Sequence, residues 1–439
     1  MSTRKPNERL ARLHREAGWT HRQFAQLVNR LGTERGTPTA YQRPSISQWL
    51  SGQAPKEETR PLIVEALSRR LRRPVTYADA GFPTPPGDSA TRTVDGLIDL
   101  GSQDMSPSRR GIVGAGLFSV ALTVPNWPDV VGRMEAVQHG TSQRVGMSDV
   151  RMVTNMTERI SELDDQFGGR HARPMAAAFL VNTVAPYLRA DATEEVRKAM
   201  LSAAAFLSYL TGYMAVDEGL QGLAQRYYVK ALELAGASAD HMTYCHVLRG
   251  MSVQAADLGH GTTAARLADA AAVAAPSTTP RMTAFLAAQQ AHAYAVAGER
   301  TQALRSLRET ETAMDKAESA AGAFGGFSPA TVAYAVSQVR YALGDAPGSV
   351  SSLKLHFRLR DSRDSQRSRL RFGSMLAERQ LEMGHLEEAC SAWSQVLDQH
   401  PAMHSGRVDR HVASISPLLK PYRANPTARA IYDRAAQAA

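Results

Sequence analysis

The feature that most constrains the fold is a series of glycines about 40 residues apart in the second half of the chain. Each follows a stretch of helical apolar periodicity and precedes another, at intervals of 40, 39, 46 and 40 residues between Gly219, Gly259, Gly298, Gly344 and Gly384. A helix that ends at glycine and leads into a second helix forms a hairpin, and hairpins repeated at a regular interval stack into a solenoid. Chance periodicity in an alanine-rich helical protein is the alternative explanation.

A small residue recurs five positions after these glycines, where it allows the second helix of a hairpin to pack closely on the first. The residues are Ala224, Ala264, Ala303, Ser349 and Ala389. The clearest copy resembles the tetratricopeptide consensus through Leu210-Thr211-Gly212-Tyr213, Ala215, Gly219, Ala224, Tyr228 and Ala231. We therefore expect a tetratricopeptide-like α-solenoid, preceded by further helices at 148–167, 176–189 and 193–210. Alanine is abundant, β-branched and aromatic residues are sparse, and no stretch alternates like a strand, so the whole chain is predicted to be all-α.

The basic charge of the chain is concentrated at one end. Residues 1–86 contain 15 Lys and Arg against 7 Asp and Glu, and this surplus accounts for nearly all of the net charge of +9. A chain of 439 residues exceeds one ordinary core. The asymmetry predicts a polyanion-binding module joined to a nearly neutral body.

Four short helices are predicted in this basic module. The first spans 7–17 and ends at Gly18, the second begins with a capping box at Thr20 and ends at Gly32, and a fourth follows Pro55. The third helix begins near Pro44 and places Ile46, Trp49 and Leu50 on one buried face. Three polar residues of this helix are then left largely outside, namely Ser45, Ser47 and Gln48.

Two segments resemble the phage-repressor-like (Xre-like) helix-turn-helix family: Gly18-Trp19-Thr20-His21-Arg22-Gln23-Phe24-Ala25, and Ser45-Ile46-Ser47-Gln48-Trp49-Leu50-Ser51-Gly52 followed by Pro55. His21 stands where that family usually has Gln, and the loop before the third helix is several residues longer than usual. A recognition helix enters the major groove through its N-terminal part, and Gln pairs well with adenine. We therefore expect base reading by Ser45, Ser47 and Gln48, and phosphate contacts from His21, Arg22, Arg35, Tyr41, Arg43 and Lys56.

The region between the two predicted domains is Pro- and Gly-rich at first and then apolar. We expect a DNA-binding domain over 1–82, a linker over 83–107, an apolar connecting or interface segment over 108–143, and a repeat domain for sensing and dimerisation over 144–439. Ser108-Arg109-Arg110 with the uncharged run 111–125 looks like a twin-arginine export signal. Such signals work from the N-terminus, and the run is shorter than the roughly 20 residues that span a bilayer, so we interpret it as an interdomain or dimer-interface helix. Export or membrane attachment is the alternative.

The sequence offers little to support catalysis. His241, Cys245 and His246 lie within two helical turns, and His400 and His404 are four residues apart, but neither group is a full metal-ligand set. No phosphate-binding loop, nucleophile elbow or dinucleotide-binding motif is present. With two cysteines no disulfide framework is available. We expect a cytoplasmic protein that is not an enzyme, binds no metal or cofactor, and does not associate with a membrane.

The whole chain resembles the actinobacterial regulators that join an Xre-like domain to tetratricopeptide repeats, and its architecture parallels the peptide-sensing quorum regulators. The resemblance implies a homodimeric transcription regulator that binds a double-stranded DNA operator and senses a peptide, small molecule or protein. The predicted ligand groove is lined by Tyr213, Arg249, Gln289 and Arg340. The alternative is a repeat scaffold that anchors a partner to DNA without sequence preference. The sequence leaves open the operator, the direction of regulation, the ligand and the pathway.

Overall fold

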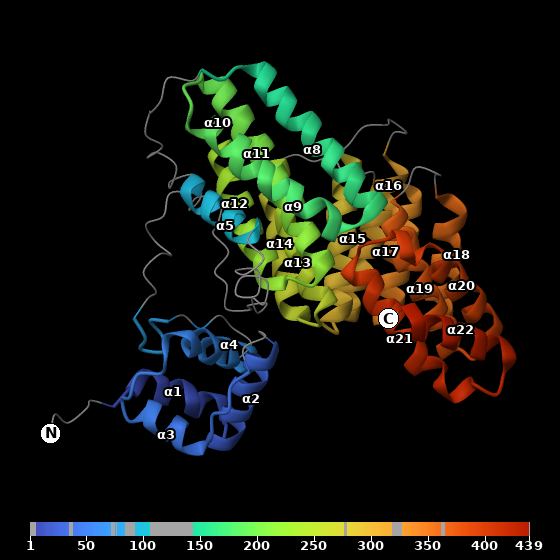
Figure 1. Ribbon diagram of the computed structural model, residues 1–439, viewed down its shortest axis with the longest axis horizontal. Helices are drawn as coiled ribbons and strands as arrows, with labels where there is room; N and C mark the ends of the chain where they lie inside the picture. The colour runs from blue at the N-terminus through green and yellow to red at the C-terminus, as the bar shows by residue number, and fades with distance from the viewer. Residues whose placement is uncertain are drawn as a thin grey trace.

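The computed structural model describes residues 6–34, 38–71, 75, 77–83, 93–105, 144–275, 279–317, 327–360 and 365–438. The prediction of an all-α chain is confirmed: the described residues form helices and no strand, with an N-terminal bundle followed by a solenoid of helical hairpins (Figure 1). The bundle and the solenoid have separate apolar cores. The predicted segment 108–143, with its twin-arginine-like stretch, lies outside the described residues.

The N-terminal bundle consists of α1 (Glu8–Ala17), α2 (His21–Glu34), α3 (Arg43–Leu50) and α4 (Arg60–Leu71). The Asn7 side chain caps α1, and Gly18 ends it with φ 65°. The predicted capping box is present, because the Thr20 amide donates to Gln23 Oε1 at 2.9 Å and the Gln23 amide donates to Thr20 Oγ1 at 3.3 Å. Gly32 was predicted to end α2, but the helix continues to Glu34. One glycine costs a helix only about 1 kcal/mol, and here neither a proline nor a left-handed turn interrupts the backbone.

The body begins with α5 (Thr93–Met105), which lies within the predicted linker range and packs on the helices that follow. Val94, Leu97 and Leu100 are buried in the main core, so part of that range belongs to the solenoid rather than to a free connection. The next elements are α8 (Met147–Phe167), α9 (Gly169–Phe179), a π-helical turn (Leu180–Val184), α10 (Ala185–Arg189) and α11 (Glu194–Glu218). The helices predicted at 148–167, 176–189 and 193–210 are thus confirmed, although α9 begins earlier and α11 ends later than expected.

The remaining helices pair in order along the chain. They are α12 (Gln221–Ala237), α13 (His241–Asp257), α14 (Gly261–Ala274), α15 (Pro280–Val296), α16 (Arg300–Asp315), α17 (Pro329–Ala342), α18 (Ala346–Leu359), α19 (Gln366–Glu382), α20 (Leu386–Gln399), α21 (Gly406–Leu419) and α22 (Pro426–Ala438). Each odd-numbered helix from α11 to α21 forms a hairpin with the helix after it.

The five aligned glycines all occupy the same position between the two helices of a hairpin. Their φ values lie between 76° and 84°, in the left-handed region that side chains other than glycine rarely adopt. In each copy the amide after the glycine donates to the carbonyl five residues earlier, as the His260 amide does to Ala255 O at 2.8 Å. This is the hydrogen bond of a Schellman turn, and its recurrence shows that the repeat is structural and not chance periodicity.

The small residues that follow the glycines are buried at the hairpin contact. Ala224, Ala264, Ala303, Ser349 and Ala389 all have 0% exposure. In one hairpin Ser252 Oγ donates to Ala264 O at 2.8 Å, and in another Ser337 Oγ donates to Ser349 O at 2.9 Å. A larger side chain at these positions would separate the two helices.

Among the described residues one helix, α11, is long and apolar enough to cross a membrane by length and composition, and 67% of its most apolar 18-residue window is buried inside the protein. It packs on α8, α9 and α12, and its buried residues belong to the main core. Both cysteines, Cys245 and Cys390, are likewise buried and unpaired.

Candidate functional site: a polar helix face and a basic cavity

The first candidate site is the outer face of α3. Ile46 and Trp49 have 0% and 5% exposure and fix the helix in the bundle core, whereas Ser47 and Gln48 are exposed and Ser45 is partly exposed. The Gln48 side chain makes no hydrogen bond within the described part of the chain. Because its buried neighbours hold the helix rigid while its amide stays unpaired, Gln48 is free to bond to a partner.

The loop before α3 is ordered by a residue that the sequence analysis missed. Asn29 of α2 donates from Nδ2 to Tyr41 O at 2.8 Å, and its Oδ1 accepts from the Tyr41 amide at 2.8 Å and from Thr39 Oγ1 at 2.9 Å. The Tyr41 hydroxyl pairs with Thr59 Oγ1 at 2.7 Å, and its ring lies edge-on to Trp49 at 4.9 Å. Tyr41 therefore supports the loop from inside the bundle. An Asn on a helix carries no sequence signal for a loop 12 residues away.

The basic residues predicted to contact phosphates are mostly on the bundle surface. Arg43 begins α3 and is exposed, and Arg22 is exposed near the start of α2. Lys56 is 77% exposed and forms a loose pair with Glu58 at 3.8 Å. His21 is partly buried, with its ring 5.1 Å from that of His14. Arg35 lies outside the described residues.

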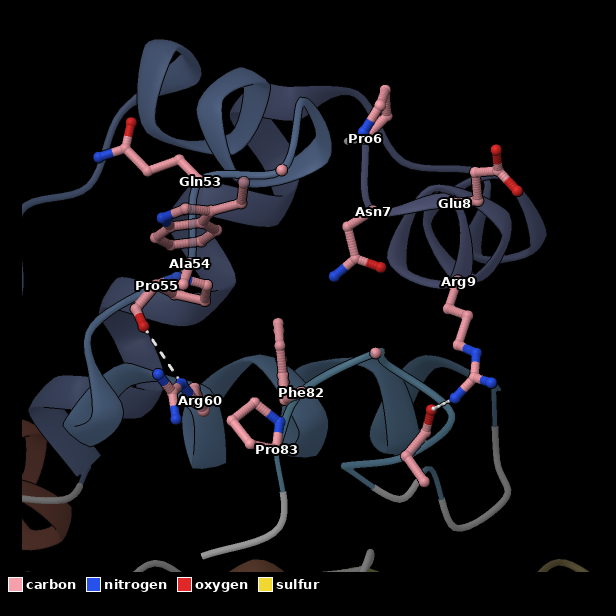
Figure 2. Close-up of a pocket in the computed structure, with 14 residues that line it drawn as sticks. Pro6, Asn7, Glu8, Arg9, Gln53, Ala54, Pro55, Arg60, Phe82 and Pro83 are labelled. Carbon is pink, nitrogen blue, oxygen red and sulfur yellow. Dashed lines mark hydrogen bonds between the residues drawn. The ribbon is translucent and has the colours of Figure 1, made fainter. Parts of the chain in front are cut away.

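A groove of about 670 Å³ lies on the bundle between the start of α1, the α3–α4 connection and residues 78–83 (Figure 2). Arg9 Nη1 donates to Ala78 O at 2.9 Å, Asn7 Nδ2 donates to Ala80 O at 3.0 Å, and Arg60 Nε donates to Pro55 O at 3.2 Å. These contacts hold the segment after α4 against α1. Their partners are backbone carbonyls, so they explain how the bundle is held together rather than what it recognises.

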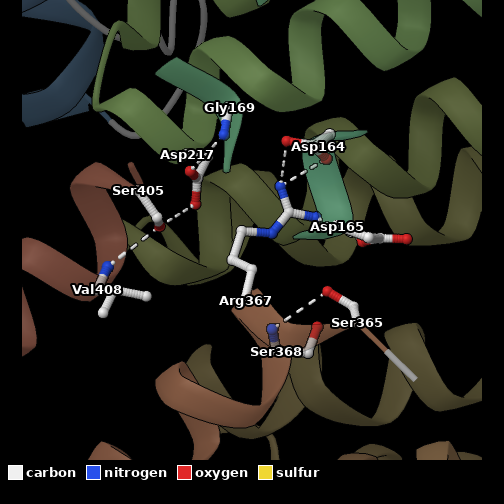
Figure 3. Close-up of polar contacts among 9 residues, drawn as sticks. All are labelled: Asp164, Asp165, Gly169, Asp217, Ser365, Arg367, Ser368, Ser405 and Val408. Carbon is white, nitrogen blue, oxygen red and sulfur yellow. Dashed lines mark hydrogen bonds and ion pairs between the residues drawn. The ribbon is translucent and has the colours of Figure 1, made fainter. Parts of the chain in front are cut away.

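The second candidate site lies inside the solenoid, which closes on itself. Helices α19 and α21 near the C-terminus contact α8 and α11 near its start. We call this contact the closure seam, formed by residues 164–170, 217–218, 367 and 404–409. Arg367 Nη1 donates to both carboxylate oxygens of Asp164 at 2.6 Å, and Ser405 Oγ donates to Asp217 Oδ1 at 2.8 Å (Figure 3).

Backbone contacts make the closure seam tight. The His404 amide donates to Phe167 O at 2.7 Å, and the Arg170 amide donates to His404 O at 3.1 Å. Gly168 has φ 93°, and a Cβ there would lie 2.5 Å from His404 O. Only glycine fits this approach, so the sequence of the seam is matched to the closed arrangement.

The four residues predicted to line a groove have different surroundings. Tyr213 faces the interior, with the Arg367 and Arg407 guanidinium carbons 5.0 and 5.8 Å from its ring centroid. Arg249 also lies inside, 4.0 Å above the Phe285 ring. Gln289 is buried between hairpins and donates to Ser252 Oγ at 2.9 Å. Arg340 is exposed and donates to Gly348 O at 3.2 Å, beside α18.

A cavity of about 370 Å³ lies among α13, α17, α19 and α21. It is lined by Asp257, Gln338, Arg371, Met375, Glu378, Arg407, Arg410, His411 and Ser414. Asp257 accepts from Arg407 at 2.7 Å and from Arg371 at 3.3 Å, and these guanidinium groups hold its pKa below the usual value against the opposing effect of burial. Glu378 accepts from His411 at 2.7 Å. The sequence analysis did not select these residues, because they come from four helices up to 157 positions apart.

A buried ion network ties α5 to the solenoid next to the seam. Arg173 of α9 has 1% exposure and pairs with Asp104 of α5 and with Glu218 at the end of α11. The Tyr227 hydroxyl donates to the other Asp104 oxygen at 3.0 Å. Glu218 directly follows Asp217, which belongs to the closure seam. The last turn of α11 therefore contacts both the seam and the anchor of α5.

Within the described ranges no three His, Cys, Asp or Glu side chains gather as they would around a metal ion. His241 instead contacts Ala274 O at 3.2 Å, and His400 contacts Asp409 at 2.9 Å. Both residues thus have internal partners.

Residues 10–83 match the family described as the SP15 N-terminal domain. A comparison of the chain with curated proteins found no significant match.

Proposed function

We propose that the protein is a sequence-specific DNA-binding transcription regulator whose repeat body binds a ligand that modulates DNA binding. The observation that carries the proposal is the α3 face, where unpaired Gln48 and exposed Ser47 stand beside Arg43 on a helix fixed by Trp49. The resemblance of α2 and α3 to the Xre-like motif, and the basic surplus of residues 1–86, support the same function.

In this proposal α3 is the recognition helix. Its N-terminal part reads base edges in the major groove, and Arg43, Arg22 and Lys56 neutralise backbone phosphates. One such helix reads too few base pairs for a genomic target, so we propose a homodimer on a two-fold operator. Light scattering at micromolar concentration with operator DNA tests this point, and a monomer would contradict it.

The repeat body acts as the sensor. A ligand that binds one arrangement of the body better than another shifts the population between them. The last turn of α11 offers a physical route for this coupling, because Asp217 contacts the closure seam and Glu218 pairs with Arg173, which holds α5. Residue 93, where α5 begins, follows the bundle by about ten positions. We propose that ligand binding alters the anchoring of α5 and so the spacing of the two DNA-binding bundles.

The test is a genome-wide DNA pull-down with the full chain at two salt concentrations. The proposal expects a recurring inverted repeat that persists at the higher salt. Signal that is independent of sequence and vanishes with salt would instead indicate phosphate contacts alone and favour a scaffold that anchors a partner to DNA.

Two substitutions sharpen this test. Gln48→Ala removes the base contact and is expected to lower discrimination at one operator position by about 1–3 kcal/mol. Arg43→Ala is expected to weaken binding to all sequences alike and to reduce the salt dependence by about one ion. The exposed Gln302 and Arg159 lie in the repeat body, so Gln302→Ala and Arg159→Ala serve as matched controls. Equal binding by the Gln48→Ala variant and the wild type on all sequences would contradict specific reading by α3.

A further inference from the structure

The inner surface of the closed solenoid carries more positive than negative charge. The odd-numbered helices place six arginines there: Arg249, Arg367, Arg371, Arg379, Arg407 and Arg410. Arg367 pairs with Asp164, and Arg371 and Arg407 share Asp257. Arg379 donates to Ser337, Ser349 and Gln338, which are all uncharged. The surface therefore lacks the carboxylates that would balance its guanidinium groups.

Arg249 shows this deficit most clearly. Its Nε is buried and has no hydrogen-bond partner among the described residues, and its only contact of note is the Phe285 ring at 4.0 Å. The titratable neighbours that act on it are the tyrosines 209, 213, 228 and 334, and no carboxylate is among them. Burial lowers the pKa of this guanidinium. A buried nitrogen that donates no hydrogen bond is costly to the folded state, so Nε is a candidate donor to a partner outside the chain.

Arg410 presents a second guanidinium group at the cavity between α13, α17, α19 and α21, where its side chain is exposed to solvent. Its side chain lines the cavity and makes no hydrogen bond within the described part of the chain. The cavity's two carboxylates are already occupied, Asp257 by Arg371 and Arg407 and Glu378 by His411. Arg407 lies close enough to Arg410 to lower its pKa further, after the effect of burial. Two neighbouring guanidinium groups, of which the Arg410 group has its N–H donors free, are suited to binding an anion.

Arg249 lies near the cavity but does not line it. His292 of α15 is close enough to interact electrostatically both with Asp257 at the cavity and with Arg249. Tyr213 lies beside Arg407, and the Tyr334 ring stacks on Phe372 at 3.8 Å, so aromatic rings lie near the arginines of the cavity. The apolar side chain among the described residues that line the cavity is Met375.

We propose that this cavity binds a small organic anion, whose carboxylate or phosphate group is held by Arg410 and Arg407 while its apolar part lies against Met375. The inference rests on the proposed sensing function and specifies the chemistry of the ligand. A volume of about 370 Å³ is in the range of small-molecule sites. A space of this size fits a small molecule and is too small for a folded protein partner.

The test is fluorescence titration of the full chain, without DNA, with anilinonaphthalene sulfonate, an aromatic anion that becomes fluorescent in a water-poor site. We expect saturable binding of one dye per chain. Arg410→Gln is expected to weaken dye binding about tenfold, because one charge-assisted hydrogen bond is lost. Arg249→Met is expected to weaken it about threefold, because that charge acts from farther away. The exposed Arg305 of α16 supplies the matched control Arg305→Gln, which should bind as the wild type does.

Two further measurements make the outcome decisive. Displacement of the dye by benzoate or by inorganic phosphate supports the inference and distinguishes a carboxylate from a phosphate ligand. The inference is overturned if no saturable binding occurs, if Arg410→Gln binds the dye as tightly as the wild type, or if the uncharged dye Nile red binds the same site equally well. Operator binding by the same samples is measured separately. If the protein binds operator DNA but not the dye, only the proposed ligand chemistry is refuted. If the folded protein does not bind operator DNA, the proposed function is refuted.

Discussion

Replacing Arg173 with Met should destabilise the repeat body more than almost any other single change. The guanidinium has 1% exposure and is paired with Asp104 at 0% and Glu218 at 10% exposure. Met keeps most of the side-chain volume but removes the Arg173 charge from the buried Asp104 carboxylate. Removing one partner of a buried ion pair costs about 3–5 kcal/mol. This is a large part of the free energy of unfolding of a folded domain, which is roughly 5–15 kcal/mol.

A double variant separates charge from packing. With Asp104→Leu and Arg173→Met together the Asp104 charge is removed along with the cation, and the remaining Glu218 carboxylate has 10% exposure. We expect the double variant to recover most of the stability lost in Arg173→Met, since apolar replacements of buried ion pairs are often neutral. The assay is urea unfolding followed by circular dichroism, with the coupling energy taken from the double-mutant cycle.

A second pair on the same helix provides the control. Asp95 of α5 pairs with Arg189, but these side chains are 41% and 49% exposed. Arg189→Met should therefore cost less than about 1 kcal/mol. The reasoning is refuted if Arg173→Met costs no more than Arg189→Met, or if the effects of the Asp104 and Arg173 substitutions simply add. In either case the buried network would not be what holds α5.

Three further predictions concern the core, the hairpins and the loop before α3. Burial lowers the pKa of His246 to about 3, below its value of about 6.5 in the unfolded chain, so the unfolded state takes up a proton at a higher pH than the folded state does. The free energy of unfolding should therefore fall by up to about 3 kcal/mol between pH 6.5 and pH 4. Urea unfolding at a series of pH values measures this dependence, and His246→Phe should flatten it. Gly298→Ala should lower the stability by about 1–2 kcal/mol because of the φ of 82° alone, since no atom lies within 4 Å of the added Cβ. Ala303→Leu should lower it more, because the larger side chain separates the two helices of the hairpin. Equal shifts in melting temperature for the two variants would contradict this. Asn29→Ala should cost about 2 kcal/mol and weaken DNA binding measured by fluorescence anisotropy, and unchanged affinity would show that the loop does not support the interface.

The sequence alone was sufficient to predict the structural features that depend on residues close together in the chain. The capping box at Thr20, the buried face of α3 around Trp49 and the hairpin turns at glycines such as Gly259 were all predicted and are present. Each is determined by contacts within a few residues, so the local side chains specify it. The main local error, at Gly32, arose because a glycine only weakly opposes a helix that its neighbours favour.

The candidate cavity depends on contacts that no local pattern records. Tyr213 and Arg249, which the sequence analysis predicted to line a groove, lie inside the solenoid on the first helix of their hairpins, but Arg371, Arg407 and Arg410 were not selected. Whether an arginine has a partner depends on which distant carboxylate reaches it, and small rotations between successive hairpins decide that.

The closure of the solenoid is the clearest example of what only the tertiary structure decided. Arg367 meets Asp164 across 203 residues, and His404 approaches Gly168 where only a glycine fits. The repeat in the sequence determines that hairpins stack, because each must bury its apolar face against the next. It does not determine the angle between them. That angle accumulates over the whole solenoid, and it alone decides whether the two ends meet and which residues gather around the basic cavity.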